Sequence, residues 1–435
     1  STGSSTSKTM AADRKNSRQI VEAGLAKRRR KERLFRGTGM LATAVGVIFL
    51  GVFFATLIVQ GSSAFVQTFI KLDVNLSESV LAPDGELDLA YADFDGLVRD
   101  ALRAEFPGVT GRSERRELYR LISAGAGYQL RDLVAADPTL VGTEITIWVP
   151  ASSNVDMLIK GNIDPEIDES LRPISDAQVA WVESLQQAER LHTRFNKALF
   201  TNGDSRDPEL AGIKGALMGS FYMLLVTVAL AFPIGVAAAI YLEEFAPKSR
   251  WSDLIEVNIN NLAAVPSIVF GLLGLAVFIN WMALPRSAPL VGGLVLSLLT
   301  LPVIIIASRA AIQSVPPSIR EAALGLGASR MQVVFHHVMP LALPGMLTGT
   351  IIGMSRALGE SAPLLMIGMV AFIVDVPGGF TDPATALPVQ VYLWADSPER
   401  AFAERTSAAI IVLLGFLLIM NLTAVIIRKR MERKW

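Results

Sequence analysis

The 435-residue sequence contains no cysteine, which excludes disulfides, thiolate metal sites and cysteine nucleophiles. Its three histidines, His192, His336 and His337, do not form a metal-binding constellation, because the two adjacent ones cannot share a helix face. The phosphate-loop pattern G-x-x-x-x-G-K-[ST] is also missing. The sequence therefore predicts no metal site, no cysteine nucleophile and no phosphate loop in this chain. Any ATP hydrolysis must be done by a partner.

Net charge is also lacking, although the charged residues are unevenly distributed. The chain has 40 basic and 40 acidic residues, and 51% of its residues are hydrophobic, which is apolar for a soluble protein. Residues 1–38 are polar and end in a basic cluster, which predicts a disordered or loosely helical cytoplasmic tail. Residues 39–60 form an uncharged apolar run, long enough to cross a bilayer core of about 30 Å. A cleaved signal peptide is the alternative, but the basic region is too long and the apolar run too extended for it.

Residues 61–213 have a different composition, with about 25 acidic and about 14 basic residues. Helical periodicity predicts a helix over residues 112–138, and alternation predicts a strand over residues 144–149. Residues 175–200 open with an S-x-x-Q capping box and predict an amphipathic helix. We expect an α+β domain outside the membrane with a stabilising or docking role, and ligand sensing is the alternative.

Residues 214–428 contain the remaining long apolar runs. They predict five further membrane spans, at residues 215–242, 254–281, 289–312, 341–374 and 408–427. The distribution of lysine and arginine places the N-terminus, the polar stretch 314–340 and the basic tail 429–435 in the cytoplasm, and residues 61–213 outside. The sequence thus predicts an all-α polytopic membrane protein with six transmembrane helices and an inserted α+β extracytoplasmic domain.

The polar stretch 314–340 carries two helix-start signals between apolar runs. Ser318 and Glu321 have the S-x-x-E spacing of a capping box, which predicts the start of a helix. Ser329 and Gln332 repeat the pattern as S-x-x-Q and predict a second helix.

A glycine separates the two predicted helices. We expect Gly327 to end the first helix as a C′ residue and Pro340 to follow the second. Arg320 and Arg330 are expected to be exposed. This helix–hinge–helix unit between two membrane spans is suited to binding another protein. The alternative is that the stretch only connects the two spans.

The same stretch resembles the EAA loop of bacterial ABC-importer permeases. The matching residues are Glu321-Ala322-Ala323, then Gly327 after three residues, and a run that closes on Pro340. His337 and Met339 depart mildly from the pattern, in which an aliphatic residue and leucine are usual. The resemblance implies a type I ABC importer permease fold and a coupling helix that docks on an ATPase subunit. The residues it assigns to coupling are Arg320, Glu321, Ala322, Ala323, Gly327 and Arg330.

Two charged residues lie within the apolar run at residues 341–374. Arg356 and Glu360 are spaced i, i+4 and would share a helix face. A charged side chain inside a membrane faces the protein interior or a water-filled path, and arginine offers a planar fork of donors for an oxyanion. We expect Arg356 to line the path of an anionic substrate and Glu360 to tune or gate it. A structural ion pair between helices is the alternative.

The stretch from Arg356 to Leu365 also resembles the signature of the phosphate-import permease family called PstA, with Ser361 where threonine is usual. Residues 265–272 and 386–392 match that family as well. The resemblance covers residue 215 to the C-terminus closely, and residues 61–213 only in the branch with a large insertion. It implies the permease subunit of an ATP-driven inorganic phosphate importer, forming half of the translocation pathway. As a transport subunit the chain is expected not to be an enzyme, and to have no catalytic residue and no cofactor of its own.

The resemblance also implies a location and partners. It predicts a multi-pass protein of the bacterial inner membrane, in contact with lipid and not with nucleic acid. The implied partners are a second homologous permease, an ATPase dimer that carries ATP and magnesium, and a periplasmic phosphate-binding protein. Arg309 is a further candidate for the substrate pathway, with Ile306 where some relatives have a basic residue. Snorkelling of Arg309 to the membrane surface is the alternative.

Two competing functions stay open from the sequence. The first is a permease for another oxyanion, such as sulfate, molybdate or phosphonate, because one arginine does not separate these anions. The second is a membrane-anchored sensor whose outer domain reports ligand to a cytoplasmic partner.

Overall fold

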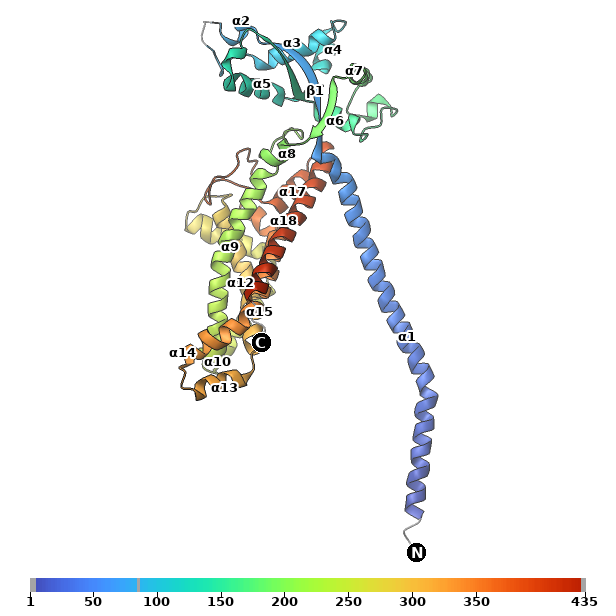
Figure 1. The fold of residues 1–435 in the computed structure, drawn as a ribbon, viewed down its shortest axis with the longest axis vertical. Helices are drawn as coiled ribbons and strands as arrows, with labels where there is room; N and C mark the ends of the chain where they lie inside the picture. The colour runs from blue at the N-terminus through green and yellow to red at the C-terminus, as the bar shows by residue number, and fades with distance from the viewer. Residues whose placement is uncertain (1–4, 84–86, 432–435) are drawn as a thin grey trace. The chain divides into compact units, whose positions relative to one another are not determined.

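The computed structural model describes residues 5–83 and 87–431. The chain forms two compact units, which divide between Val59 and Gln60. Most of the first unit is helix α1 (Ser5–Ser62), which continues without a break from the basic residues into the apolar run (Figure 1). The predicted N-terminal tail is therefore helical from Ser5 onward. Residues 1–4, and residues 432–435 of the predicted C-terminal tail, lie outside the described residues.

The second unit begins with a three-stranded antiparallel sheet in the order β2-β1-β3. The strands are β1 (Val66–Asn75), β2 (Glu144–Pro150) and β3 (Leu191–Phe195). On the central strand, Ile70, Leu72 and Val74 are fully buried on one face, as the two-residue repeat of a strand requires. The strand expected over residues 144–149 is confirmed, whereas β1 and β3 were not predicted.

Helices cover the buried face of this sheet and complete one hydrophobic core with it (Figure 1). The longer ones are α3 (Phe94–Glu105), α4 (Arg112–Tyr119), α5 (Gly125–Ala136), α6 (Ser153–Ile159) and α7 (Asp176–Gln187). Short helical segments connect them: η1 (Ser63–Phe65), α2 (Glu78–Leu81), η2 (Pro138–Leu140), η3 (Glu169–Leu171) and α8 (Ala198–Thr201).

The prediction of one continuous helix over residues 112–138 is wrong, because two helices, α4 and α5, occupy this range. α4 and α5 are separate because residues 121–123 run beside the end of β2, where the Ser123 backbone N–H donates to the Pro150 carbonyl at 3.0 Å. The helix predicted over residues 175–200 is also too long. Its capping box is confirmed, but the chain turns at Glu189 (φ 55°), and residues 191–195 pair with β1 as a strand.

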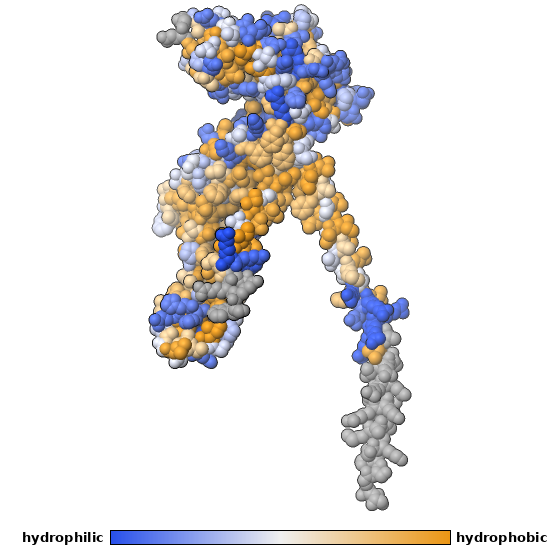
Figure 2. Space-filling model, viewed as in Figure 1, coloured by the Kyte–Doolittle hydropathy of each residue, from blue (hydrophilic) through white to orange (hydrophobic). Residues whose placement is uncertain are grey.

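The remaining helices form an apolar bundle, whose surface contrasts with the polar sheet region (Figure 2). The longest are α9 (Lys214–Ile240), α12 (Pro289–Gln313), α15 (Met339–Gly359) and α18 (Ala401–Met431). Shorter ones are α10 (Arg250–Ala263), α11 (Ser267–Gly274), α13 (Pro317–Gly325), α14 (Arg330–Gln332), α16 (Ala362–Met366) and α17 (Leu387–Ala395). Three π-helical segments extend them: η4 (Tyr241–Phe245), η5 (Leu275–Trp281) and η6 (Val333–Val338).

α12 lies at the centre of the bundle and packs against both α9 and α15. Glycines allow the close approach: a Cβ at Gly293 would lie 2.5 Å from Val226 on α9, and one at Gly349 would lie 2.2 Å from Ala307 on α12. Small residues at helix contacts are the usual means by which membrane helices pack closely.

Two of the predicted spans have a different course. Among the described residues, five helices are long and apolar enough to cross a membrane, or six if α10 and the α11–η5 helix count as one span. That pair is bent by 100° at the segment ending in Pro266, which begins α11 rather than lying inside a straight helix. The span predicted at residues 341–374 instead runs over Arg330–Gly359, because Glu360 is extended and ends the helix.

A buried polar network joins the sheet region to the start of α18. The Lys160 ammonium lies 2.6 Å from the Asp156 carboxylate and 2.9 Å from that of Glu404, and all three side chains are at most 8% exposed. Ser63 and Asn162 also donate to Glu404, at 2.8 Å and 3.2 Å. Because each charge has a partner, the network compensates much of the desolvation penalty of burying these groups.

Two more carboxyl groups are buried close to this junction. Burial raises the pKa of Glu209 above its ordinary value, although Ser123 bonds its carboxylate and Arg405 is a nearby positive charge. Burial likewise raises the pKa of Asp204, although the Trp394 indole N–H donates to it at 2.9 Å. Both residues precede α9, on the side of the bundle that carries the sheet.

Candidate functional site

The predicted coupling loop folds as two helical segments joined at a glycine. α13 begins after Pro316, and Ser318 makes no capping hydrogen bond, so the first predicted capping box is wrong. Two prolines start the helix instead, because proline has a helical φ and lacks the N–H that a first turn leaves unpaired. Gly327 follows the helix with φ +84°, as predicted for a C′ residue.

The second capping box of this loop is present. The Ser329 side chain accepts from the Gln332 backbone N–H, and the Gln332 side chain accepts from the Ser329 backbone N–H at 2.8 Å. The helix does not stop before Pro340, however. α14 continues through η6 into α15, so one helix of 30 residues leads from the loop into the bundle. The wide turn of η6 accommodates the proline, whose ring cannot fit a regular α-helical ladder.

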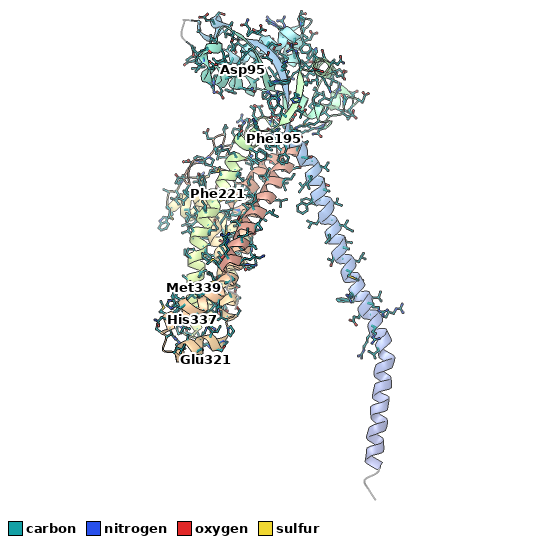
Figure 3. The ribbon with its side chains drawn as sticks, viewed as in Figure 1. Asp95, Phe195, Phe221, Glu321, His337 and Met339 are labelled. Carbon is teal, nitrogen blue, oxygen red and sulfur yellow. The ribbon has the colours of Figure 1, made fainter. Side chains whose placement is uncertain are left out.

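The loop exposes apolar as well as polar side chains. Glu321, Ala322, Gly327 and Arg330 are exposed, whereas Ala323 is buried against the bundle. The large apolar side chains left exposed are Leu324, Leu326, Met331 and Phe335, with Leu326 at 90%. Figure 3 shows Glu321, His337 and Met339 together at the end of the bundle away from the sheet. Exposed apolar groups beside charged ones are typical of a surface that another protein covers.

Arg320 does not belong to that exposed surface, contrary to the prediction. Its guanidinium donates to the Glu244 carboxylate at 2.8 Å and 3.1 Å, and to the carbonyls of Ile312 and Val315 at 2.9 Å and 2.7 Å. It thereby joins α13 to η4 and to the end of α12. The planar guanidinium has five N–H donors and can reach all of these acceptors at once. A lysine, with its single ammonium group, could not bond all of them together.

Arg309 is held in a second group of charges at the same end. Its Nε lies 2.5 Å from Glu243 and its Nη2 lies 2.9 Å from Glu256. Gln313 also donates to Glu243 at 3.0 Å. The side chain is therefore held between two carboxylates. The signal in the sequence was the Glu243-Glu244 pair directly after an apolar run, which the sequence analysis did not use.

Arg356 and Glu360 are brought together inside the bundle, at the end of α15. Their side chains form an ion pair with 3.5 Å between Arg356 Nε and Glu360 Oε1. Arg356 is 49% exposed and Glu360 19%. Because Glu360 caps the helix and Ser361 precedes α16, the three side chains lie at a break between helices rather than along one helix face.

The segment that carries Arg356 is also tied to α18. The Ser355 hydroxyl donates to the Asn421 side-chain oxygen at 2.7 Å, and Arg428 Nη1 donates to the Thr348 hydroxyl at 3.1 Å. Hydrogen bonds between helices fix their rotation in an apolar medium. No group of three or more possible metal ligands occurs among residues 5–83 and 87–431.

Comparison with known proteins matches two family models. Residues 231–434 match the binding-protein-dependent transport system inner membrane component, and residues 22–169 match DUF3333, a domain of unknown function. The chain is 32% identical over 217 residues to the phosphate transport system permease protein PstA 1 of Mycobacterium tuberculosis, covering 50% of this chain and 70% of that protein. It is 30% identical to PstA of Haemophilus influenzae, covering 52% of this chain and 78% of the relative. The chain belongs to the PstA permease family.

Two further similarities cover smaller parts of the chain. The "Probable ABC transporter permease protein YqgI" of Bacillus subtilis is 38% identical over 35% of this chain, and the match spans about half of YqgI (52%). A solved structure of the MetNI methionine ABC transporter aligns with 49% of this chain and 94% of its own length, at 16% identity and a TM-score of 0.39. The part that matches the transport component begins within α9 and covers the rest of the described helical bundle. The protein is a multi-pass inner-membrane permease of largely helical structure.

Proposed function

We propose that this chain is the permease subunit of an ATP-driven importer of inorganic phosphate, in which it forms half of the translocation pathway. The observation that carries the proposal is the half-exposed Arg356 guanidinium within a PstA-type helical bundle, with one carboxylate at 3.5 Å. A single loosely paired cation can bind an oxyanion through its fork of donors. Glu360 would tune the charge of the site, and Ser361 would offer a hydroxyl.

Arg309 is a weaker member of this proposed pathway. Its two carboxylate partners already compensate its charge. An anion would bind there only if Glu243 or Glu256 moved away, for example during a change between inward and outward states.

The coupling loop would transmit the state of an ATPase partner to this site. Glu321, Ala322, Gly327 and Arg330 lie on the exposed surface that would dock, with Ala323 packed beneath it. The helix then runs without interruption to Arg356, about 24 Å beyond Pro340 at about 1.5 Å per residue. A rigid helix of this kind would move the substrate site when the loop moves.

The proposed assembly contains a second homologous permease, two ATPase subunits that bind ATP and magnesium, and a soluble phosphate-binding protein. In this arrangement α10 and α11 together form the third of six spans. The basic ends of the chain and the coupling loop lie in the cytoplasm, as the positive-inside rule requires, and residues 61–213 form an inserted domain on the outer side. Lipid surrounds the bundle and no nucleic acid is involved.

Uptake of labelled phosphate by cells that lack this subunit tests the proposal. Wild type should restore phosphate uptake and leave sulfate uptake unchanged. Arg356→Ala should fail to restore uptake even when the variant is present in the membrane at the normal level, because the substitution removes the guanidinium that is proposed to bind the anion. Restored sulfate uptake would indicate that the substrate is another oxyanion. Normal transport by Arg356→Ala would leave the permease function standing but would show that Arg356 does not bind the substrate.

A further inference from the structure

Five arginines surround one tyrosine in the sheet region, away from the predicted substrate pathway. Arg112, Arg115, Arg116 and Arg120 come from α4 and the residue after it, and Arg99 comes from α3, which packs beside α4. With Tyr119 they line an open pocket of about 560 Å³. The Arg99 guanidinium lies over the Tyr119 ring at 5.8 Å from its centre. We refer to these six residues as the arginine pocket.

None of the five arginines forms an ion pair within 4 Å in the described part of the chain. One hydrogen bond is made, from Arg115 Nε to the Val109 carbonyl at 3.3 Å. Arg99, Arg112, Arg116 and Arg120 are exposed, so their donors face solvent. This lack of partners contrasts with the other arginines of the same region, such as Arg103, Arg131 and Arg190, which are paired with carboxylates.

The carboxylates of α4 are directed away from the pocket. Glu117 accepts from the Ser175 hydroxyl at 3.2 Å, on the side of the helix that packs against α7. Glu114 folds back to the helix start, where its carboxyl carbon lies 3.3 Å from the position a Cβ at Gly111 would have. Neither glutamate of α4 therefore forms an ion pair with the pocket arginines in the described part of the chain.

This concentration of like charge destabilises the helix that carries it. Arg112 and Arg116, and Arg116 and Arg120, are spaced i, i+4, and each such pair costs a few tenths of a kcal/mol. The surrounding region has about 25 acidic and about 14 basic residues, so opposite charges are plentiful but are not placed here. An anion bound in the pocket would remove the repulsion.

We propose that the arginine pocket binds phosphate groups, as a site separate from the intramembrane Arg356. A phosphate group carries up to two charges and at least three acceptor oxygens, so it can engage several arginine forks at once and compensates more positive charge than one carboxylate does. The pocket volume is larger than one phosphate ion needs. The phosphate groups therefore come either from free inorganic phosphate or from a chain of them, as in polyphosphate.

Calorimetric titration of the full chain in lipid nanodiscs, at low ionic strength, tests this site. The probes are inorganic phosphate and a short polyphosphate of defined length. The double variant Arg112→Gln/Arg116→Gln should bind at least about tenfold more weakly to whichever probe the wild type binds. Loss of one charge-assisted hydrogen bond lowers an affinity by about this factor. The control Arg103→Gln/Arg131→Gln removes the same charge from paired arginines and should change the affinity by less than about twofold. All titrations are repeated in an Arg356→Ala background, so that binding at the proposed substrate pathway does not contribute and the loss caused by the pocket substitutions is measured on its own.

Weaker binding by Arg112→Gln/Arg116→Gln would not be explained by misfolding, because glutamine is a good helix former and the change relieves like-charge repulsion. The double variant should unfold at the wild-type temperature or above it. Arg112→Lys/Arg116→Lys keeps the charge but loses the forks, and we expect an intermediate affinity. Equal losses in the double variant and the control would overturn the site, as would a wild type that binds neither probe. A double variant that binds both probes normally but loses association with an acidic partner protein would also overturn it.

Discussion

Glu209 is one of the few carboxyl groups that the fold buries outside the membrane helices, at 5% exposure. Burial disfavours its charged form and raises its pKa above the ordinary 4.5. Below pH 4.5 the group is protonated in both the folded and the unfolded chain. As the pH rises, the unfolded chain releases the proton first, so the free energy of unfolding falls until the pH passes the raised pKa of the folded state.

Glu209→Gln should therefore stabilise the protein at neutral pH and lose this advantage near pH 4. Glutamine keeps a hydrogen-bonding side chain beside Ser123 but has no charge to desolvate. Thermal unfolding of both proteins between pH 4 and pH 8 measures the effect. A difference in unfolding temperature that is constant over this range would contradict the assignment.

Arg320 is a second side chain whose role the structure changes. Its contacts with Glu244 and two carbonyls indicate that it positions α13 rather than touching a partner. We predict that Arg320→Gln keeps its affinity for the ATPase partner but transports at least about tenfold less, because charge-assisted hydrogen bonds of this kind contribute about 1.5–3 kcal/mol. Arg330→Gln, which alters the exposed surface, should instead weaken ATPase association. Pull-down of the partner together with uptake separates the two effects, and lost association in Arg320→Gln would make it a docking contact.

At the scale of elements, the coupling loop depends on the backbone of one glycine. Gly325 and Gly327 both have free space where a Cβ would be, but Gly327 alone has a positive φ, +84°. Gly327→Ala should therefore cost about 1–2 kcal/mol through backbone strain. Gly325→Ala lies inside α13 and should stabilise it by about 0.5–1 kcal/mol.

Hydrogen exchange of the α13 amides measures this pair of variants. We expect faster exchange in Gly327→Ala and slower exchange in Gly325→Ala, relative to wild type. Similar changes in both variants would show that the helix end does not need a left-handed residue.

Elements with a local signal in the sequence were predictable. The capping boxes at Ser175 and Ser329, the glycine end at Gly327 and the long apolar helices follow from short-range patterns. The breaks did not: α15 stops at Glu360, and the 100° bend before α11 depends on how helices pack around it. β3 was interpreted as the end of a helix because its apolar spacing suits both structures, and pairing with β1 decides between them.

The sequence indicated which charged residues belong to the candidate site better than it indicated how their side chains are arranged. Arg356 and Glu360 are paired, as their spacing suggested, although the helix ends between them. The carboxylate partners of Arg309 and Arg320 are Glu243, Glu244 and Glu256, each more than 50 positions away in the sequence. Long-range contacts of this kind have no local pattern in one sequence.

At the scale of the whole molecule, the sheet region and the bundle are joined through Lys160. Its ammonium is 5% exposed between Asp156 and Glu404. Lys160→Met would leave both carboxylates buried without this cation, and removing one member of a buried pair costs about 3–5 kcal/mol. We expect a clear fall in the unfolding temperature of the detergent-solubilised protein. The control Lys197→Met changes an exposed lysine and should have an effect within about 0.5 kcal/mol. Equal unfolding temperatures for the two variants would mean that the junction does not hold the two parts together.

The central claim is that this chain conducts phosphate under the control of an ATPase. Accumulation of labelled phosphate in proteoliposomes that contain this chain, its second permease, the ATPase and the binding protein tests it most directly. We expect accumulation that needs hydrolysable ATP, and we expect Arg356→Ala to abolish it without loss of any subunit from the complex. A fully assembled complex that hydrolyses ATP but accumulates no phosphate would contradict it.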